Sequence, residues 1–446
     1  MFCHPVVQHD KMNFAKKLQQ VINHDLCTRC GSCVGLGRGK INFTGYTGTL
    51  LPHIVEPLDE ELAGELWEAC SGQDVDFPAL DRFVFEGKGT HHPYFGTYLD
   101  LSIGYATDRA IRRRGGSAGV ISATLSWLLD KKLIQGALVL GMSKEEPWLP
   151  RSFIATTHEE IVSAAQSKYL VSPVNETLPE LEKFDGRLAY VGLPCQVHSI
   201  RKLQMAGHPS VEKIKYIIAP YCGLNLHFSS IISFLKSHGE KDYHDIVDLQ
   251  FRHGEWPGSM RVEMKNGKVY QLPKFHANYL IPFHMMNRCR VCIDFANEFA
   301  DISVGDAWAP RYEERGKGFS IVVTRSVHGK KILDLMLQEG IVNLQPVSVQ
   351  DAVRMHSHMY DNKKRGAFLR MKKRKYPPYY HLGFPLNIGF RRRLFEFWLN
   401  IMSCLLRTKI MVKLAQVLPA KVTGSVFNSF KVAWKKITFN VKREDL

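Results

Sequence analysis

The sequence lacks three features that would each have assigned its class. Its longest apolar run, Leu394 to Leu406, is interrupted by Glu396 and is shorter than the about 20 largely apolar residues of a transmembrane helix. The first ten residues lack the apolar core of a secretory signal. Internal repeats and low-complexity tracts are also missing, and 45% apolar with 23% charged residues is ordinary for a globular protein. We therefore expect a folded cytoplasmic protein of about three domains.

Acidic residues are scarce in one part of the chain. Residues 361–446 contain 20 Lys and Arg against 4 Asp and Glu, whereas the first 360 residues contain 39 of each. The C-terminal part thus carries the whole net charge of +16. A domain that binds nucleic acid would instead have its basic residues spread over a folded surface. No nucleic-acid partner is expected.

Cysteine, in contrast, is abundant and unevenly spaced. Without a secretory signal, disulfides are not expected, and closely spaced cysteines indicate metal or redox chemistry. Cys3 and Cys404 are interpreted as packing residues. The other eight are enough for two sites of four thiolates: Cys27, Cys30, Cys33, Cys70, Cys195, Cys222, Cys289 and Cys292.

The first cysteine group begins with a triplet in which Cys27, Cys30 and Cys33 are each separated by two residues. Such a triplet wraps one face of a cuboidal iron–sulfur cluster. A bacterial ferredoxin has its next cysteine where this chain has Gly37, so the fourth ligand has to come from elsewhere, and Cys70 is the nearest remaining thiol. Zinc is the main alternative, although zinc sites usually use separated cysteine pairs.

Strand and helix patterns alternate through the middle of the chain. A glycine-rich turn at 115–119 precedes a segment with a helical apolar face, and Ser117 is the expected N-cap of that helix. Short buried strands are expected at 136–141, 188–192, 214–218, 301–306 and 321–325.

The second cysteine group combines the Cys-x-x-Cys pair Cys289 and Cys292 with two cysteines that each follow an expected strand, Cys195 and Cys222. Open α/β sheets bind ligands at the carboxyl ends of their strands, so both strand-end cysteines are expected at one edge of the sheet. A second four-iron cluster is the favoured interpretation. A catalytic Cys195 and a purely structural role for the strand-end cysteines stay open.

No G-x-G-x-x-G fingerprint follows an expected strand, so a dinucleotide would need another binding element. The turn at 115–119 can bring backbone N–H groups to a pyrophosphate, although such glycines, taken alone, more often form a turn without a ligand. Residues 167–169 add a cation and an aromatic ring, and Lys168 is otherwise a solvated surface lysine. The candidate flavin contacts are Gly115, Gly116, Ser117, Gly119, Ser167, Lys168 and Tyr169.

Taken together, these segments resemble the family of coenzyme F-420 hydrogenase and dehydrogenase beta subunits, which includes the plant 7-hydroxymethyl chlorophyll a reductase. One departure is that Ser71 follows Cys70, where a ferredoxin-type ligand often precedes proline. The resemblance extends over about residues 25–335, and its last segment is the most specific. The similar segments, in the family's order, are 27–33, 115–119, 165–169, 192–196, 221–223, 289–294 and 300–306.

The resemblance implies bound FAD, two four-iron, four-sulfur (4Fe-4S) clusters and electron transfer between a one-electron carrier and a two-electron substrate. The expected function is an iron–sulfur flavoprotein oxidoreductase that takes electrons from a ferredoxin-like donor to a deazaflavin-like or other organic acceptor. Lys168 is the candidate catalytic residue, near the flavin N1. Asp294, Asp301 and Asp306 are interpreted as capping or turn residues. The alternatives are an electron-relay subunit that docks a catalytic partner and a zinc-bearing scaffold.

The expected fold is α/β (mixed α+β) in four parts. Residues 1–80 form a small ferredoxin-like iron–sulfur domain, 81–185 and 186–360 form the central flavin-binding body, and 361–446 form a basic, partly amphipathic helical tail. In the tail, cations flank the apolar run on both sides. That pattern suits a helix packed on the body, an interfacial helix on a membrane surface, or a docking helix for an acidic ferredoxin.

Overall fold

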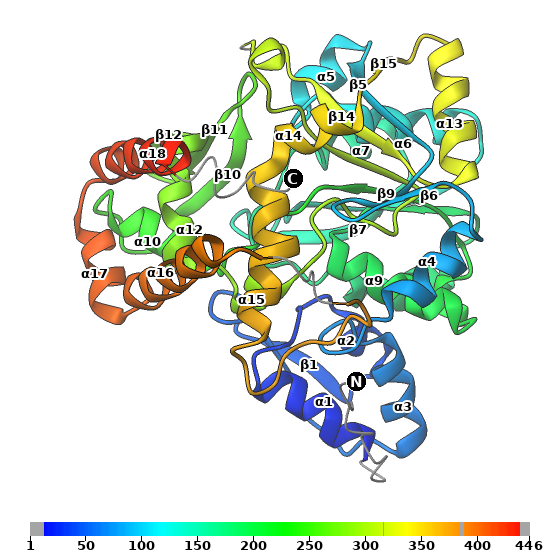
Figure 1. Cartoon of the computed structure of the whole chain (residues 1–446), viewed down its shortest axis with the longest axis horizontal. Helices are drawn as coiled ribbons and strands as arrows, with labels where there is room; N and C mark the ends of the chain where they lie inside the picture. Colours follow the sequence, from blue (N-terminus) through cyan, green and yellow to red (C-terminus); the bar gives the residue numbers. More distant parts are fainter. Residues whose placement is uncertain (1–12, 315, 384–387, 438–446) are drawn as a thin grey trace.

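The computed structural model describes residues 13–314, 316–383 and 388–437. At its centre is an eight-stranded mixed sheet in the order β15-β5-β14-β13-β9-β8-β6-β7 (Figure 1). The four strands β13, β9, β8 and β6 run parallel to one another, and antiparallel strands extend the sheet on both sides. The strands are β5 (Asp100–Ala106), β6 (Gly136–Met142), β7 (Pro150–Ala155), β8 (Leu188–Tyr190), β9 (Ile214–Pro220), β13 (Ile302–Asp306), β14 (Ser320–Thr324) and β15 (Val342–Pro346).

This architecture confirms the mixed α/β fold expected from the sequence. All five strands expected from short apolar runs are present, as β6, β8, β9, β13 and β14. Strands that are buried on both faces consist of continuous apolar segments, which is why these strands could be predicted from the sequence.

Helices cover both faces of the sheet. The apolar core under α6 and α13 lies on one face, and the core under α9 lies on the other. The adjacent β9 residues Ile217 and Ile218 belong to different cores, because successive side chains of a strand point to opposite faces. The helices of this part are α4 (Phe77–Phe85), α5 (Arg109–Arg114), α6 (Val120–Asp130), α7 (His158–Ser163), α8 (Leu178–Lys183), α9 (Pro194–Met205) and α13 (Val327–Gln338).

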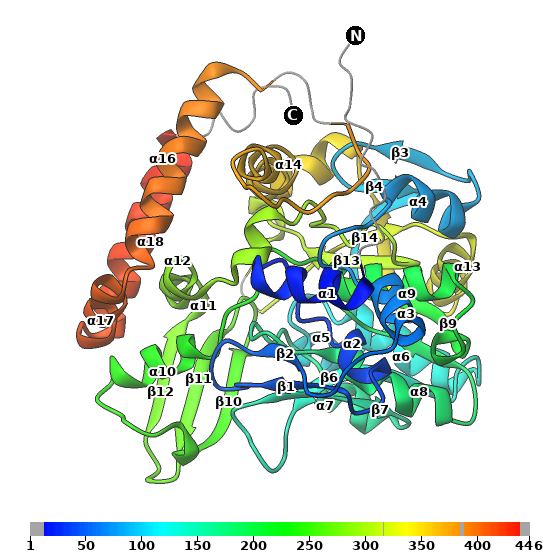
Figure 2. The same cartoon turned by 90° about the horizontal axis from the view of Figure 1, so that it is seen from below.

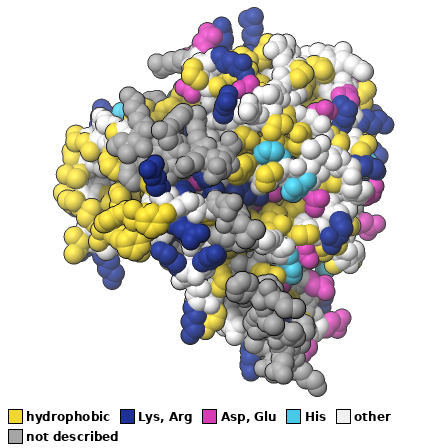
Figure 3. Space-filling model, viewed as in Figure 1, with side chains coloured by type: hydrophobic (Ala, Val, Ile, Leu, Met, Phe, Trp, Pro, Cys, Tyr) yellow, Lys and Arg dark blue, Asp and Glu magenta, His cyan; other side chains and the backbone are white. Residues whose placement is uncertain are grey.

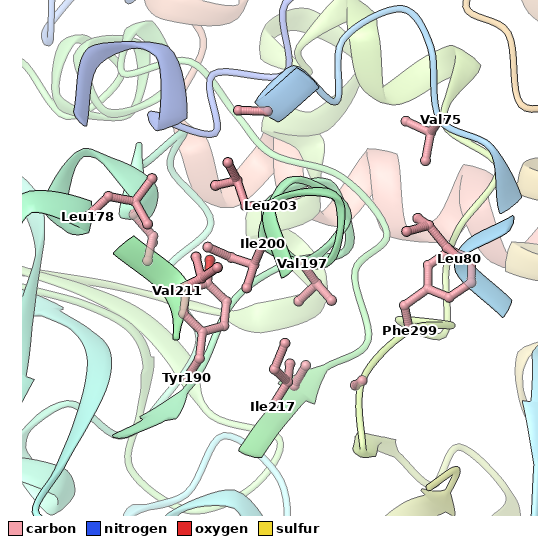
Figure 4. Close-up of a cluster of buried hydrophobic side chains, with 14 of the residues drawn as sticks. Val75, Leu80, Leu178, Tyr190, Val197, Ile200, Leu203, Val211, Ile217 and Phe299 are labelled. Carbon is pink, nitrogen blue, oxygen red and sulfur yellow. The ribbon is translucent and has the colours of Figure 1, made fainter. Parts of the chain in front are cut away.

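The core under α9 is shown in Figure 4. Val197, Ile200 and Leu203 of α9 lie over Tyr190 of β8 and Ile217 of β9. All five side chains are at most 1% exposed. This packing holds the first turn of α9 against the carboxyl ends of the two parallel strands.

The N-terminal segment lies beneath this face of the sheet (Figures 1 and 2). Leu36, Leu62 and Leu66 belong to the same apolar core as Val197 and Ile200 of α9, so the segment shares its core with the body. Its elements are α1 (Phe14–Asn23), α2 (Ser32–Leu36), β1 (Ile41–Thr44), β2 (Leu51–Ile54) and α3 (Glu60–Ala69), and the hairpin β3 (Thr90–His92) and β4 (Gly96–Tyr98) follows α4.

A second, smaller sheet stands beside the central one and has its own apolar core. It is antiparallel in the order β10-β11-β12, and short helices pack on it (Figure 1). This unit was not predicted from the sequence. Its elements are β10 (Ile246–His253), β11 (Ser259–Met264), β12 (Val269–Pro273), α10 (Ser229–Lys236), α11 (Lys274–Ala277) and α12 (Ile281–His284).

A long helix crosses the molecule between the two sheets (Figure 1). It consists of α14 (Val349–Tyr360), a π-helical segment (Asp361–Gly366) and α15 (Ala367–Met371). The basic tail expected to start at residue 361 therefore begins inside this helix, and Lys363, Lys364, Arg365 and Arg370 are buried.

Three of these four buried cations, Lys364, Arg365 and Arg370, pair with buried carboxylates. Asp361 accepts hydrogen bonds from Arg365 and Arg392, each at 2.8 Å. Glu396, the charge inside the apolar run of the tail, accepts from Arg370 at 2.6 Å and from Arg392 at 2.8 Å. The buried part of the positive charge is thus compensated inside the protein, whereas other cations of the tail, such as Lys409 and Lys413, are exposed.

Three further helices end the described chain: α16 (Phe390–Leu406), α17 (Lys409–Val417) and α18 (Ala420–Ile437). The apolar run of the tail forms most of α16. Within the described ranges, no single helix is long and apolar enough to cross a membrane, and α17 with residues 420–433 reaches that length only across a bend of 118°.

Candidate functional site

The four N-terminal candidate cysteines lie together. Cys27 and Cys30 are in the loop before α2, Cys33 is in α2, and Cys70 directly follows α3. Burial raises the pKa of the Cys33 thiol well above its usual value, and the neighbouring thiols of Cys27, Cys30 and Cys70 raise it further. Burial likewise raises the pKa of Cys27 to about 12. The thiolate forms therefore need a positive partner, such as bound metal, inside this site.

Close contacts of Ser71 and Gly72 fix the loop that carries Cys70. Gly72 donates its N–H to Cys70 Sγ at 3.4 Å, and a Cβ at this glycine would lie 2.6 Å from Val21 Cγ1. Ser71 occupies the position where proline is frequent, and its hydroxyl lies 3.0 Å from the hydroxyl of Thr28 in the Cys27 loop. Ser71, which departs from the ferredoxin pattern, therefore links the Cys70 loop to the Cys27 loop.

The second candidate group also comes together. Cys195 lies in the first turn of α9 after β8, Cys222 follows β9, and Cys289 and Cys292 lie at a short helical turn. Because β8 and β9 are adjacent and parallel, their carboxyl ends meet at one edge of the sheet. Burial raises the pKa of Cys195 well above its usual value. The nearby thiols of Cys222, Cys292 and Cys289 raise this pKa further, and Cys30 of the first group makes a smaller contribution in the same direction. The two groups are therefore neighbours.

Both groups offer thiol donors supported by backbone N–H groups. Arg29 donates its N–H to Cys27 Sγ and Asn225 donates its N–H to Cys289 Sγ, each at 3.4 Å. Among the described residues, no three His, Cys, Asp or Glu side chains converge as the ligands of one metal ion would. In a cuboidal cluster each thiolate binds a different iron atom, so its ligands surround a larger volume.

Two cysteines, Cys3 and Cys404, lie outside these groups. Cys404 was interpreted as a packing residue, but the structure shows it exposed on α16, so that interpretation is wrong. Cys3 lies outside the described residues.

A buried lysine faces the second cysteine group. Lys363 of the π-helical segment is 1% exposed, and its Nζ donates to the carbonyl oxygen of Cys289 at 3.4 Å. Burial lowers the pKa of Lys363, but the thiols of Cys292, Cys289 and Cys222 outweigh burial and raise it. A permanent positive charge therefore lies beside these sulfur atoms. No pattern in the sequence distinguishes this lysine from the others in the basic segment.

A cavity of about 890 Å³ opens beside the carboxyl ends of the parallel strands. This volume lies in the range typical of cofactor and ligand sites. Cys222 lines it, so the second cysteine group borders the cavity. All seven candidate flavin contacts also line it: Gly115, Gly116, Ser117, Gly119, Ser167, Lys168 and Tyr169.

The glycine-rich turn differs in detail from the expectation. The N-cap of α6 is Gly119, which has φ +75°, and not Ser117, whose hydroxyl donates to the carbonyl oxygen of Phe319 at 2.8 Å. A Cβ at Gly115 would lie 2.7 Å from the nitrogen of Gly119, so the turn closes too tightly for a side chain. A glycine N-cap leaves the first N–H groups of the helix without a side-chain acceptor, as an anion site requires.

Lys168 is half-buried and is not the solvated lysine of the simplest interpretation. Its Nζ donates to the carbonyl oxygens of Ala164, Ala165 and Gln166, the latter two at 2.8 and 3.2 Å. Burial, and then Arg114, lower the pKa of the ammonium to about 7. The lysine thus orders the loop that follows α7 along the wall of the cavity.

A charged and aromatic cluster beside the cavity was not predicted from the sequence. Arg252 donates to Asp306 at 3.3 Å and to the hydroxyl of Tyr169 at 3.2 Å, and Lys274 Nζ lies 4.4 Å from the centroid of the Trp308 ring. Burial opposes ionisation of Tyr169, but Lys274 and Arg252 outweigh it and lower the pKa of the phenol. Burial also opposes ionisation of Asp306, yet Arg252 and Lys274 lower its pKa to about 2.

The cluster was missed because both cations belong to the small sheet unit. Arg252 lies on β10 and Lys274 at the start of α11, and neither element was predicted. Asp294 has the turn role that the sequence suggests, but the same interpretation of Asp301 and Asp306 is wrong, because Asp301 pairs with Arg201 at 3.1 Å and Asp306 pairs with Arg252. Asp294 accepts the N–H of Glu298 at 3.0 Å, and Asp301 accepts the N–H of Ile217 at 2.8 Å.

Two family models match the central body of the chain. Residues 102–179 match the N-terminal part of the beta subunit of coenzyme F-420 hydrogenase/dehydrogenase. Residues 185–350 match the C-terminal part of the same beta subunit. Together the two models cover more than half of the chain, including the glycine-rich turn, most of the cavity wall and the second cysteine group.

Several curated proteins are similar over much of their length. A protein of Methanosarcina mazei, named as one of the subunits of F(420)H(2) dehydrogenase, is 29% identical over 328 residues, covering 72% of this chain and 86% of that protein. The beta subunit of coenzyme F-420 hydrogenase of Methanothermobacter thermautotrophicus is 29% identical over 260 residues, covering 56% and 86%. Coenzyme F-420-dependent sulfite reductase of Methanocaldococcus jannaschii is 26% identical over 352 residues, covering 74% of this chain but only 49% of the reductase.

One solved structure shares the fold. A protein chain of the F-420-reducing NiFe hydrogenase complex from Methanosarcina barkeri superposes with a TM-score of 0.52 at 22% sequence identity. The alignment covers 67% of the present chain and 100% of the other. The remaining third of this chain has no counterpart there.

Proposed function

Because the chain belongs to the family of coenzyme F-420 hydrogenase and dehydrogenase beta subunits, we propose that it is an iron–sulfur flavoprotein oxidoreductase. It transfers electrons between a ferredoxin-like donor and an organic two-electron acceptor, with two 4Fe-4S clusters and FAD as cofactors. When bound, such clusters exchange single electrons, and a flavin exchanges either electrons or a hydride. The observation that carries this proposal is the order in space of the first cysteine group, the second group and the cavity.

That order follows from two contacts. Cys30 of the first group is close enough to raise the pKa of Cys195 in the second group. Cys222 of the second group lines the cavity. One-electron carriers held by the two groups would therefore form a short series that ends at the cavity wall.

The cavity residues fit a flavin dinucleotide by three features. The glycine N-cap of α6 offers N–H groups to a pyrophosphate. Ser230 lines the cavity with a buried hydroxyl that has no hydrogen-bond partner among the described residues. An ideal Cβ at Gly116 would lie 3.2 Å from Ser167 Oγ, so the two candidate segments lie side by side on the cavity wall. Gly115–Gly119, Ser167, Lys168 and Tyr169 would hold the cofactor.

The decisive experiment is a cofactor analysis of the anaerobically purified protein. We expect a brown protein with a flavin shoulder in its spectrum, about eight iron and eight sulfide per chain, and one FAD. Zinc in place of iron would support the scaffold alternative and contradict the proposal. Iron without flavin would agree with the two clusters but contradict the assignment of the cavity as the FAD site.

A Gly116→Val variant is expected to lose most of its FAD. Gly116 does not have a positive φ, so the backbone tolerates a side chain, but valine would project between the turn and Ser167 where the cofactor approaches. FAD is measured in the supernatant of the acid-precipitated protein. Gly383→Val is the matched control, because Gly383 also lacks a positive φ and a Cβ there meets no atom of the described residues within 4 Å. Full flavin occupancy in folded Gly116→Val would show that this turn is not the cradle.

A Lys363→Met variant is expected to lower the midpoint potential of the second cluster only. The buried ammonium beside Cys289, Cys292 and Cys222 stabilises the more negative, reduced state. Removing one charge at about 8 Å would shift the reduction free energy by on the order of 2 kcal/mol at an effective dielectric constant of about 20. A redox titration followed by electron paramagnetic resonance measures this shift.

Lys364→Met is the matched control for this potential. Lys364 is the next residue of the same buried segment, but its charge is already paired with Glu298. Burial already raises the pKa of Glu298 to about 7 although Lys364 lowers it, so without Lys364 this carboxyl takes up a proton and the net charge near the cysteines stays the same. Equal shifts in both variants would show that the effect is a general perturbation of the helix.

An electron-relay subunit without its own substrate is the second candidate. It is favoured by the names of two relatives, which describe them as subunits of a dehydrogenase and of a hydrogenase. A purified chain that oxidises reduced ferredoxin but reduces no low-molecular-weight acceptor would support it. Reduction of an organic acceptor by the chain alone would exclude it.

A further inference from the structure

Helices α16, α17 and α18 present bulky apolar side chains to the outside. The three helices follow one another along one edge of the molecule (Figures 1 and 2), and Figure 3 shows hydrophobic side chains gathered over that edge with Lys and Arg beside them. Ile410 is 78% exposed and Val417 is 80% exposed. The other exposed members of this face, called the apolar edge below, are Phe390, Leu394, Phe397, Trp398, Leu405, Leu414, Leu418, Val422, Val426, Phe430 and Val432.

Small residues lie on the inner side of α17 and α18. Ala415 and Ala420 are 3% and 1% exposed, and a Cβ at Gly424 would lie 2.9 Å from the Cβ of His276. Gln416 Nε2 donates to Ser233 Oγ at 2.9 Å and anchors α17 to α10. A helix that served only to cover the body would turn its bulky apolar residues inward. Here Phe427 of α18 packs on the core, but thirteen bulky apolar side chains of the three helices are exposed, so the outer side needs another explanation.

The charges around the apolar edge have one sign. The only acidic residue between positions 390 and 433 is Glu396, which is 2% exposed and paired with Arg370 and Arg392. The exposed surface of this described segment therefore carries no carboxylate. Its exposed cations are Arg391, Arg393, Lys409, Lys413 and Lys421.

We propose that the apolar edge binds the surface of an anionic lipid bilayer. Bulky aliphatic and aromatic side chains flanked by cations suit the boundary between acyl chains and headgroups. Anionic headgroups would neutralise the surrounding cations, which attract such lipids when they lie near the membrane surface. A second copy of the chain would instead bring two sets of like charges together.

The geometry fits a protein that lies on the membrane and does not cross it. Neither α16 nor α17 nor the described part of α18 is a spanning helix by itself. The apolar edge also adjoins the cavity, because Asn428, Lys431 and Val432 of α18 line it. Attachment would therefore bring the cavity mouth close to the lipid surface.

The test is a vesicle flotation assay with the anaerobically purified full chain at low salt. We expect co-flotation with vesicles of equal parts phosphatidylglycerol and phosphatidylcholine, weaker co-flotation with phosphatidylcholine alone, and loss of binding in high salt. The double variant Ile410→Ser/Val417→Ser should lower the bound fraction roughly tenfold, because it removes two branched apolar side chains from the contact.

A matched double variant, Val327→Ser/Leu337→Ser, is the control. These residues are 53% and 45% exposed on α13, on the other side of the molecule, and their replacement should leave flotation unchanged. Both variants are checked for unaltered iron and flavin content. No flotation of the wild-type chain at low salt, or equal flotation of both double variants, would overturn the proposal. A solution dimer that only Ile410→Ser/Val417→Ser dissociates would also overturn it, since the apolar edge would then bind a second copy.

Discussion

A Cys30→Ser variant is expected to lose roughly half of the bound iron, the content of one whole cluster. Cys30 is 8% exposed and lies with Cys27, Cys33 and Cys70, so its loss leaves three thiols around a cluster that needs four. A serine hydroxyl does not ionise near neutral pH and is a poor replacement for a thiolate. Iron and acid-labile sulfide per chain are measured after anaerobic purification.

Two further variants make this result specific. Cys404→Ser changes an exposed cysteine outside both groups and should keep all of the iron. Cys292→Ser should lose the second cluster and keep the spectroscopic signal of the first. If Cys292→Ser retains its iron but loses activity, Cys292 acts as a redox thiol. Unchanged iron in Cys30→Ser would remove the first-cluster assignment.

An Arg325→Met variant is expected to lower the free energy of unfolding by roughly 3–5 kcal/mol. Arg325 is completely buried and donates to the carbonyl oxygens of Phe95, Thr97 and Ala296 and to the hydroxyl of Ser303. Removing the guanidinium leaves these buried acceptors unpaired, at about 1–3 kcal/mol each before relaxation, and opens a cavity. Denaturant unfolding of the apoprotein measures the change.

The position of Arg325 connects this stability to the site. Ala296 lies in the loop that joins the second cysteine pair to β13, and Phe95 and Thr97 lie at the β3–β4 hairpin. Arg113→Met is the matched control, since the Arg113 side chain is 75% exposed, and a change within about 0.5 kcal/mol is expected there. Comparable destabilisation by the two substitutions would mean that the buried network contributes little.

The sequence indicated the elements with strong local patterns. The parallel strands are continuous apolar segments because both of their faces are covered, and each of them was found within two residues of its observed ends. The strands of the small sheet were not found. In β10, alternate residues such as Asp248, Gln250 and Arg252 interrupt the apolar pattern, because this antiparallel sheet has a polar face.

The candidate cysteine groups could be assigned from the sequence alone. Cysteine is rare enough that spacing and strand ends suffice to sort eight of them into two sets, and the structure brings each set together. The sequence likewise located the segments that line the cavity, since glycine-rich turns and strand ends have local signatures.

The role of each charge, in contrast, depends on the three-dimensional arrangement of the chain. Lys363 and Lys413 are indistinguishable in a basic stretch of sequence, yet one lies buried against cysteine thiols and the other is exposed on the apolar edge. The same holds for Glu396, whose burial leaves the outer surface of α16–α18 without a carboxylate. The energy of a charge depends on its desolvation and on partners from distant segments, and neither is encoded in the local sequence.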